Sequence, residues 1–252
     1  MTTRILVTGH NGFIGKEVFA SLREVFGFTV QGLDRPDDIG DFIGPSGMFA
    51  EHWDCIIHLA AYAALRDSVD NPQKFWDNNV EKSKPIFDYC RQNNVRLLYA
   101  SSAGAEEWWR NPYATTKKAN ELMAPPNSVG MRFFNVWAEE GSRDDMLYEM
   151  LKQGTARYLT RHKRDWIHVD DVCTAIAKLI YSDYTGTVDV GTGVTTSVLE
   201  LANALIGENE LPIQEWTPNE PDILKANPVV LREMGWVPTP FLDKIQSKCY
   251  TK

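Results

Sequence analysis

The stretch RILVTGHNGFIGKEVFASL, residues 4–22, determines the fold that we predict for this chain. An apolar run leads into three glycines, Gly9, Gly12 and Gly15, and then into a segment with the apolar spacing of a helix. A glycine turn between a strand and a helix lets the backbone approach a pyrophosphate, whose charge lies against the first N–H groups of the helix. The stretch predicts a dinucleotide site, although a plain strand–turn–helix has the same pattern.

The same alternation of short apolar runs and longer amphipathic segments continues through the first half of the chain. The predicted strands are RILVTG, FTVQGLD, CIIHLAA, VRLLYASS and SVGMRFFNV, and predicted helices include residues 16–26 and 72–93. Such alternation is typical of βαβ units. We predict an α/β fold in which residues 1–138 form a doubly wound, Rossmann-type parallel sheet. Residues 139–252 are predicted to form mainly a small substrate lobe, with segments around 165–192 returning to the main domain.

Composition excludes several classes of function. The 252 residues carry a formal net charge of -8, which argues against a nucleic-acid partner. No apolar run is long enough to span a membrane, so we do not expect a membrane as a partner. The four cysteines lack C-x-x-C spacing, which fits a reducing cytoplasm. His58 and His168 lie in apolar segments without ligand-spaced partners, so we predict hydrogen-bonded core residues and no metal site.

Asp34 ends the strand that follows the first predicted helix. A carboxylate at this position accepts hydrogen bonds from an adenosine ribose and repels a 2′-phosphate. NAD is therefore the favoured cofactor. The neighbouring Arg35 keeps NADP open, and an acidic residue after a strand is also common in ordinary turns.

Tyr113 and Lys117 lie four positions apart in NPYATTKKANE, residues 111–121, and so share one face of a predicted helix. A free phenol has a pKa of about 10, so Tyr113 needs a nearby cation in a partly closed pocket to act as a base. The spacing alone is common in surface pairs. Ser102, however, ends a predicted strand shortly before Tyr113, and the carboxyl ends of parallel strands open onto the ligand crevice. Ser102 can hydrogen-bond the substrate hydroxyl from which Tyr113 removes a proton.

Eight motifs, in order, resemble the extended short-chain dehydrogenase/reductase family in its NAD-dependent nucleotide-sugar epimerase/dehydratase branch. They are VTGHNGFIG, DCIIHLAA, NNV (residues 78–80), YASS, NPYATTK, MRFFNV, RDWIHVDDV and DVGTGVTTSVLELA. The resemblance covers nearly the whole chain. It implies a soluble, cytoplasmic enzyme with NAD as cofactor and a small-molecule substrate, most often a nucleotide sugar.

The resemblance also implies roles for individual residues, with Ser102, Tyr113 and Lys117 as the catalytic triad. The implied cofactor-binding residues are Gly9, Gly12, Phe13, Ile14, Gly15, Asp34, Asp38, Ile39, Leu59, Ala60, Ala61, Asn78, Tyr113, Lys117, Phe134 and Val136. Asn79 is the alternative to its neighbour Asn78. The implied substrate-binding residues are Ser102, Asn135 and Arg164. Arg164 would contact a diphosphate, unless it is an ordinary cation of the basic cluster at 161–164.

The residues after Ser102 favour an epimerase. Dehydratases of the family place acid/base carboxylates there, whereas this chain has Ala103 and Gly104, which cannot transfer a proton. We expect oxidation of a sugar hydroxyl by hydride transfer to NAD, with Tyr113 as the base, followed by reduction of the keto intermediate. A dehydrogenase or reductase of a sugar or related alcohol, with net redox and NAD or NADP, uses the same residues and stays open. A non-catalytic sensor of NAD or of a sugar nucleotide is the third alternative.

Two departures from the family concern the surface. The segment between Ser102 and Tyr113 is unusually short, and it carries Trp108 and Trp109, which form either a stacking wall for a sugar or base or a cover over an exposed core. Two prolines at 125 and 126 are predicted to end the helix of Tyr113 after about three turns. Family dimers pair through a longer version of this helix, so a homodimer of the usual kind is in doubt.

Overall fold

The computed structural model describes residues 3–35, 52–215 and 219–249. The chain divides into two compact units, which are considered separately. The first comprises Met1–Arg132 and Cys173–Val188, and the second comprises Phe133–Val172 and Asp189–Lys252.

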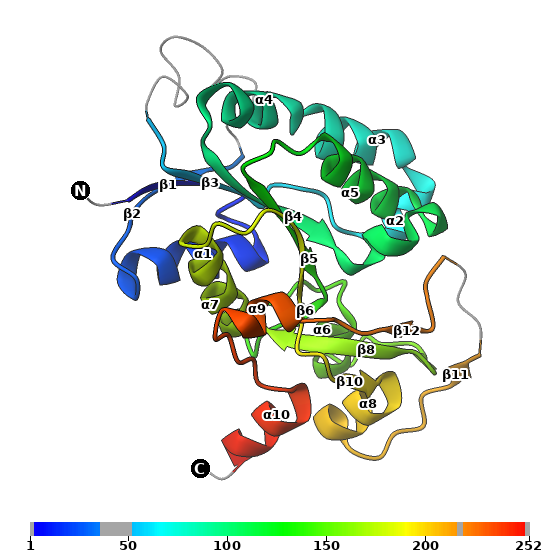
Figure 1. The fold of residues 1–252 in the computed structure, drawn as a ribbon. Coiled ribbons are helices and arrows are strands. Elements are labelled where there is room, and N and C mark those ends of the chain that lie inside the picture. Colours follow the sequence, from blue (N-terminus) through cyan, green and yellow to red (C-terminus); the bar gives the residue numbers. More distant parts are fainter. Residues whose placement is uncertain (1–2, 36–51, 216–218, 250–252) are drawn as a thin grey trace. The chain divides into compact units, whose positions relative to one another are not determined.

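The first unit is built on a six-stranded sheet in the order β2-β1-β3-β4-β5-β9 (Figure 1). The strands span Arg4–Thr8 (β1), Thr29–Leu33 (β2), Cys55–His58 (β3), Arg96–Ser102 (β4), Ser128–Phe133 (β5) and Gly186–Val190 (β9). The pairs β1–β2, β1–β3 and β3–β4 are parallel. The chain runs from β1 outward to β2 and returns to β3 on the other side of β1. This reversal creates the switch point at which open α/β sheets bind their ligands.

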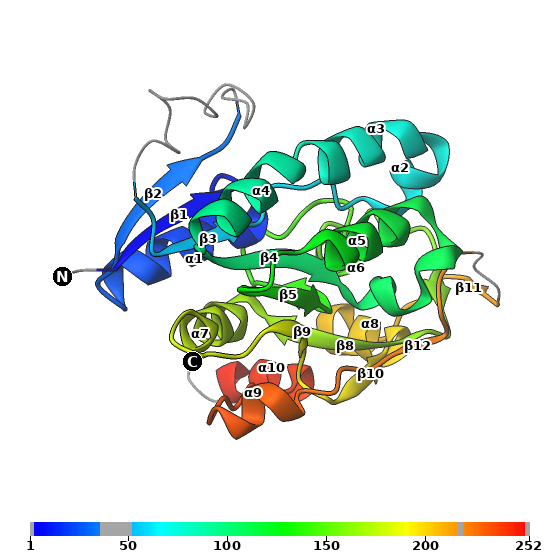
Figure 2. The same ribbon diagram turned by 45° about the horizontal axis from the view of Figure 1, so that its top comes forward.

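Helices cover both faces of this sheet, with α3, α4 and α5 on one face and α1 and α7 on the other (Figures 1 and 2). The helices associated with this sheet are α1 (Phe13–Glu24), α2 (Leu65–Asp70), α3 (Pro72–Trp76), the π-helix η3 (Asp77–Glu81), α4 (Lys84–Asn93), the 3-10 segment η4 (Ala103–Arg110), α5 (Pro112–Met123) and α7 (Val169–Ile180). Helix α7 begins in the second unit and continues in the first. The prediction of a Rossmann-type parallel sheet wrapped by helices is confirmed.

The core of this unit follows from the apolar runs of its strands. All four residues of β3 are buried, as expected for a central parallel strand that is covered on both faces. Leu6, Ile56 and Leu97 are register partners on β1, β3 and β4, and each is fully buried. Ile86 and Phe87 of α4 complete the same cluster. The apolar side of α4 thereby fixes that helix against the sheet.

The predicted single helix over residues 72–93 is wrong in detail. The chain forms α3, then one turn of π-helix in η3, and only then α4. Pro85 has no N–H to donate to the carbonyl of Glu81, so the regular hydrogen-bond ladder cannot pass this point. The interruption places Asn79 in the π-turn, where its side chain is fully buried.

The predicted strand SVGMRFFNV is also divided, into β5 and β6 (Asn135–Trp137). The break falls at Phe134, whose N–H bonds to the carbonyl of Val190 over 3.3 Å. Strand β6 pairs in parallel with β8 (Lys163–His168) and belongs to a different sheet from β5. Apolar patterning cannot show that a continuous run changes sheets.

The second unit contains a four-stranded sheet in which β8 pairs with β6, β10 and β12, and a two-stranded sheet of β7 and β11. Its other strands are β7 (Leu159–Thr160), β10 (Thr195–Ser197), β11 (Ile213–Gln214) and β12 (Ile223–Leu224), and its helices are α6 (Leu147–Lys152), α8 (Val198–Ile206), α9 (Val229–Glu233) and α10 (Phe241–Cys249). Trp137, Trp166 and Phe241 lie in its core. Within residues 3–35, 52–215 and 219–249, no helix has both the length and the apolar character needed to cross a bilayer.

Candidate active site

The glycine turn, Gly9 to Gly15, packs so closely that two of its glycines cannot be replaced without movement. Gly9 has φ +75°, and a Cβ on it would lie 2.6 Å from the main-chain nitrogen of Ala60. A Cβ on Gly15 would lie 2.0 Å from the carbonyl oxygen of Gly9. Gly12, the residue before α1, provides no side-chain cap for that helix. The turn therefore brings bare backbone to the start of α1, as a pyrophosphate site requires.

Asp34 lies against this turn at the end of β2. Its carboxylate accepts hydrogen bonds from the N–H groups of Asn11 and Arg35, each over 2.8 Å. The guanidinium of Arg35 lies over the ring of Tyr62, 5.2 Å from its centroid. The acidic group is thus fixed beside the glycine turn, and Arg35 has an aromatic partner of its own. This arrangement fits the adenosine end of NAD.

The segment after β3 borders the same turn. The N–H of Leu59 bonds to the carbonyl of Thr8 over 3.0 Å, and Ala60 lies against Gly9, as described above. The predicted pair Asp38 and Ile39 lies outside the described residues.

The side chain of Asn79 is buried and takes part in four hydrogen bonds. Its amide oxygen accepts from the N–H of Tyr62 over 2.8 Å, and its amide nitrogen donates to the carbonyl of Tyr62 and to the hydroxyl of Thr116. Asn78 is less buried and donates to Asn79 over 3.0 Å. Asn79 therefore links the segment after β3 to helix α5, while Asn78 is the more exposed member of the pair.

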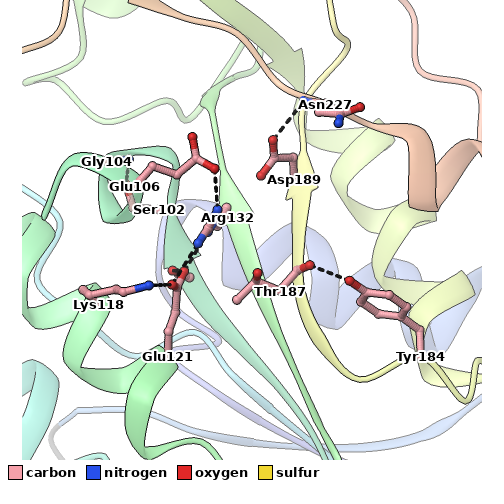
Figure 3. Close-up of polar contacts among 11 residues, drawn as sticks. Ser102, Gly104, Glu106, Lys118, Glu121, Arg132, Tyr184, Thr187, Asp189 and Asn227 are labelled. Atoms are coloured by element: carbon pink, nitrogen blue, oxygen red, sulfur yellow. Dashed lines mark hydrogen bonds and ion pairs between the residues drawn. The ribbon is translucent and has the colours of Figure 1, made fainter.

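Ser102, Tyr113 and Lys117 come from two elements that meet at the carboxyl end of β4. Ser102 is the last residue of β4, and its hydroxyl accepts the N–H of Gly104 over 3.2 Å (Figure 3). The ammonium of Lys117 donates to the carbonyl of Ala100 over 2.8 Å and lies 5.7 Å from the ring centroid of Tyr113. The structure thus gathers the predicted triad around the end of a single strand.

The first turn of α5 is anchored through two of its N–H groups. Asn111 caps the helix by accepting the N–H of Ala114 over 2.8 Å. The N–H of Tyr113 itself donates to the hydroxyl of Ser68, a buried residue of α2, over 3.1 Å. Helix caps of this kind contribute about 1 kcal/mol each. Tyr113 is therefore held by its backbone as well as by its helix.

Burial changes the acid–base chemistry of two groups in this region. Lys117 is 2% exposed, and burial lowers its pKa from 10.5 to about 8, so it still carries a charge at neutral pH. Burial, together with the charge of Lys117, lowers the pKa of His58 from 6.5 to about 3. His58 is therefore neutral, and its ring nitrogens lie 2.7 Å from the hydroxyl of Thr8 and 2.8 Å from that of Ser83.

Phe13, Ile14 and Ala61 of the first unit are partly exposed, and the remaining predicted site residues belong to the second unit. Val136 is buried, whereas Phe134 and Asn135 are partly exposed. The guanidinium of Arg164 is engaged, because it pairs with the carboxylate of Glu220 over 3.1 Å and donates to two main-chain carbonyls. Within the described residues, no group of three or more His, Cys, Asp or Glu side chains is arranged to hold a metal ion. His168, as predicted, is a buried, hydrogen-bonded residue, 2.8 Å from Glu139.

Several polar residues around the site were not singled out from the sequence. Thr8, Ser68, Ser83 and Thr116 are examples, and their partners lie far away along the chain. Glu121 is another, and here a signal exists: it lies three positions after Lys118, with which it pairs on the same helix.

Comparison with known proteins agrees with this architecture. Residues 5–191 match the NAD dependent epimerase/dehydratase family, and the chain belongs to that family. An uncharacterized 37.6 kDa protein of Escherichia coli O111:H- is 30% identical in an alignment that covers 75% of this chain and 74% of that protein. The UDP-glucose 4-epimerase of Thermus thermophilus, solved in complex with NAD, has a TM-score of 0.80 at 25% identity, with 96% of each chain covered.

Dehydratases are found among the structural neighbours as well. TunA, described as an NAD-dependent NDP-hexosamine 5,6-dehydratase, has a TM-score of 0.77 at 23% identity and covers 96% of this chain and 95% of its own. The resemblance to extended short-chain dehydrogenases/reductases is confirmed, as is NAD as the cofactor of the family. The chain is an enzyme of the epimerase/dehydratase class.

Proposed function

We propose that this protein is an NAD-dependent epimerase of a nucleotide sugar. The observation that carries the proposal is the surroundings of Ser102, where the next two residues, Ala103 and Gly104, offer no group that transfers a proton. The nearest carboxylates on η4 are already paired, Glu106 with Arg132 and Glu107 with Arg110. Elimination of water needs an acid and a base beyond Tyr113, and this segment supplies neither.

The residues proposed to hold NAD are those of the sequence prediction, with the glycine turn on the pyrophosphate and Asp34 on the adenosine ribose. Leu59, Ala60 and Ala61 would line the dinucleotide, and Asn78 would contribute from η3. Bound NAD supplies a hydride acceptor that can return the hydride. In the second unit, Phe134 and Val136 are proposed to border the nicotinamide, and Asn135 and Arg164 to contact the substrate. For Arg164 this role requires that a diphosphate share or replace its partner Glu220.

The chain's own residues would manage the proton. Tyr113, as a phenolate, removes the proton of the sugar hydroxyl. The carbon that bears this hydroxyl gives up a hydride to the acceptor, and the hydroxyl becomes a ketone. Ser102 donates a hydrogen bond to the same oxygen, and the Lys117 ammonium stabilises the phenolate. When hydride returns to the opposite face of the ketone, Tyr113 gives the proton back. The carbon is inverted with no net redox change.

The proposal is tested with the purified enzyme, NAD and three probes: UDP-glucose, UDP-glucuronic acid and UDP-N-acetylglucosamine. Nuclear magnetic resonance should show one probe converted to an epimer, while reduced nicotinamide does not accumulate. Tyr113→Phe should retain NAD and lose turnover by at least about a hundredfold. Stoichiometric formation of reduced nicotinamide would instead establish a dehydrogenase. NAD binding without turnover of any probe would favour the sensor.

A further inference from the structure

A buried ionic network links the two elements that carry the predicted catalytic residues. Its centre is Glu121 of α5, whose side chain is 3% exposed. The carboxylate accepts hydrogen bonds from Ser101 on β4 over 2.7 Å and from Arg132 on β5 over 2.8 and 3.0 Å. Lys118, one turn earlier on α5, adds a fourth contact at 3.2 Å (Figure 3). These contacts all lie within the first unit.

The network meets β4 directly beside Ser102. Successive side chains of a strand point to opposite faces of the sheet, so the side chains of the neighbours Ser101 and Ser102 lie on opposite faces. Ser101 is buried and fixed by Glu121, while the neighbouring carbonyl of Ala100 is fixed by Lys117. Two consecutive residues before Ser102 are therefore each bonded to α5. No comparable pair of bonds to another helix is found for the last residues of β1 in the described part of the chain.

Electrostatics stabilise Glu121 as an anion. Burial raises the pKa of Glu121, but hydrogen bonds from Arg132 and Ser101 outweigh it, so the pKa lies below its ordinary value. A buried carboxylate with these donors accepts a strong, charge-assisted bond from a serine hydroxyl. The bond between Ser101 and Glu121 is thus both short and directional.

The guanidinium of Arg132 has a second, exposed contact. It reaches Glu106 of η4 over 2.6 Å, and the Glu106 side chain is 64% exposed, whereas that of Arg132 is 14% exposed (Figure 3). Exposed ion pairs contribute little, typically about 0 to 1 kcal/mol. We therefore attribute the stabilising effect of the network to its buried contacts, Ser101–Glu121–Arg132. The exposed pair of Arg132 with Glu106 adds little.

From these contacts we infer that Ser101 and Glu121 are positioning residues for the proposed reaction: their hydrogen bond holds the end of β4 so that Ser102 keeps its place relative to Tyr113 and Lys117. The inference rests on the proposed function for its kinetic consequence. It does not assign a chemical step to either residue. Loss of the bond allows the end of β4 to shift against α5, and a misplacement of about 1 Å can lower a rate by about a hundredfold.

The kinetic test is a double-mutant cycle with the probe that the parent enzyme turns over. Ser101→Ala should lower kcat about tenfold or more in the parent, and less than about twofold in the Ser102→Ala background, because the bond acts through Ser102. Ser101→Thr, which keeps the hydroxyl, should restore most of kcat. Glu121→Gln should resemble Ser101→Ala. The affinity for NAD should stay within about twofold in all of them, since none is proposed to contact the cofactor.

Glu106→Gln is the matched control, because it removes the exposed partner of the same guanidinium and should leave kcat unchanged. Equal losses of kcat in the parent and Ser102→Ala backgrounds would mean a general structural role and overturn the inference. A Ser101→Ala enzyme with the kcat of the parent would also overturn the inference.

A second measurement is independent of the substrate and separates this inference from the proposed function. Crystal structures of the parent and of Ser101→Ala, each with NAD, should show the Ser102 hydroxyl displaced or in several conformers in the variant, with its contact to the N–H of Gly104 weakened. An unmoved Ser102 overturns the inference even if the enzyme is an epimerase. A parent that turns over none of the three probes overturns the proposed function, and the displacement of Ser102 still decides the positioning role.

Discussion

Lys117 donates a hydrogen bond to the main-chain carbonyl of Ala100 over 2.8 Å, and this bond ties the middle of α5 to the end of β4. The ammonium cannot swing into solvent without losing this bond and leaving its buried position. Its position beside the ring of Tyr113 is therefore fixed before any ligand binds. A fixed, buried charge acts on a neighbouring phenol far more strongly than an exposed one.

Replacement of this charge should change the pH profile. In Lys117→Met the phenolate proposed for Tyr113 loses the cation that stabilises it. The acidic limb of the kcat profile then shifts to higher pH, and kcat at neutral pH falls at least about tenfold. Lys84→Met, which removes an exposed ion pair with Glu81, should leave the profile in place. An unshifted limb in Lys117→Met would contradict the role of the ammonium.

Asp34 should determine the choice between NAD and NADP. Asp34→Asn removes the charge that is proposed to face the adenosine ribose, so NAD affinity should fall about tenfold and discrimination against NADP should weaken. Isothermal titration with both dinucleotides measures the two effects. Asp54→Asn is the control, because Asp54 also accepts a backbone N–H, from Arg4, but at the opposite end of the strands. Unchanged discrimination in Asp34→Asn would show that another residue selects the cofactor.

Gly15 should tolerate no side chain. In Gly15→Ala the new Cβ would lie 2.0 Å from the carbonyl of Gly9, so the turn must open. We expect a loss of NAD binding and a fall of about 2 kcal/mol or more in the free energy of unfolding. Gly27→Ala separates strain from collision: Gly27 has a positive φ, +69°, with open space around it, whereas Gly15 lies in helix α1 without a positive φ. The cost of Gly27→Ala should be about 1 to 2 kcal/mol, with NAD affinity unchanged. Chemical denaturation measures the stability of the two variants, and titration with NAD measures their affinity for the cofactor.

His58 should make stability dependent on pH in the acidic range. In the folded protein its pKa is about 3, and in the unfolded chain it returns to about 6.5, so the unfolded state binds a proton that the folded state does not. Stability is therefore fully present above pH 6.5 and falls as the pH decreases toward 3, by about 1.4 kcal/mol per pH unit from this group. His58→Asn should flatten that slope in urea unfolding curves. A slope equal to that of the parent would show that other groups cause it.

The sequence predicted the fold well because the signals were local. The glycine turn, the apolar strands and the prolines that end α5 each depend on neighbours within a few positions, and the family match agrees with them. The end of α5 at Met123, just before the two prolines, is confirmed. The π-turn before Pro85 was missed because the residues on either side of it have the pattern of one helix. The separation of β5 from β6 was missed because an apolar run has the same pattern whether it stays in one sheet or enters another.

The site was less accessible to prediction. The roles of Ser102, Tyr113 and Lys117 remain predictions, though the structure gathers them at one strand end. The contacts around them join residues that lie far apart in the chain, such as Tyr113 with Ser68. No local pattern marks such partners. Asn79 illustrates the difficulty, since its burial and its bonds to Tyr62 and Thr116 distinguish it from its neighbour Asn78, and the sequence shows neither.

The eight-residue segment η4 has a bearing on how substrate preference could be redesigned. It joins β4 to α5, and its tryptophans, Trp108 and Trp109, are 44% and 64% exposed, so neither seals a core. Side chains outside the segment also hold it: the hydroxyl of Thr115 donates to the carbonyl of Trp108, and the guanidinium of Arg132 pairs with Glu106. Ala103 and Ala105 anchor the start of η4 in the core, so the part that can be exchanged is the exposed stretch around the two tryptophans. If the proposed function holds, loops of other lengths and compositions inserted there should alter the choice of substrate while the sheet, the glycine turn and helix α5 stay as they are.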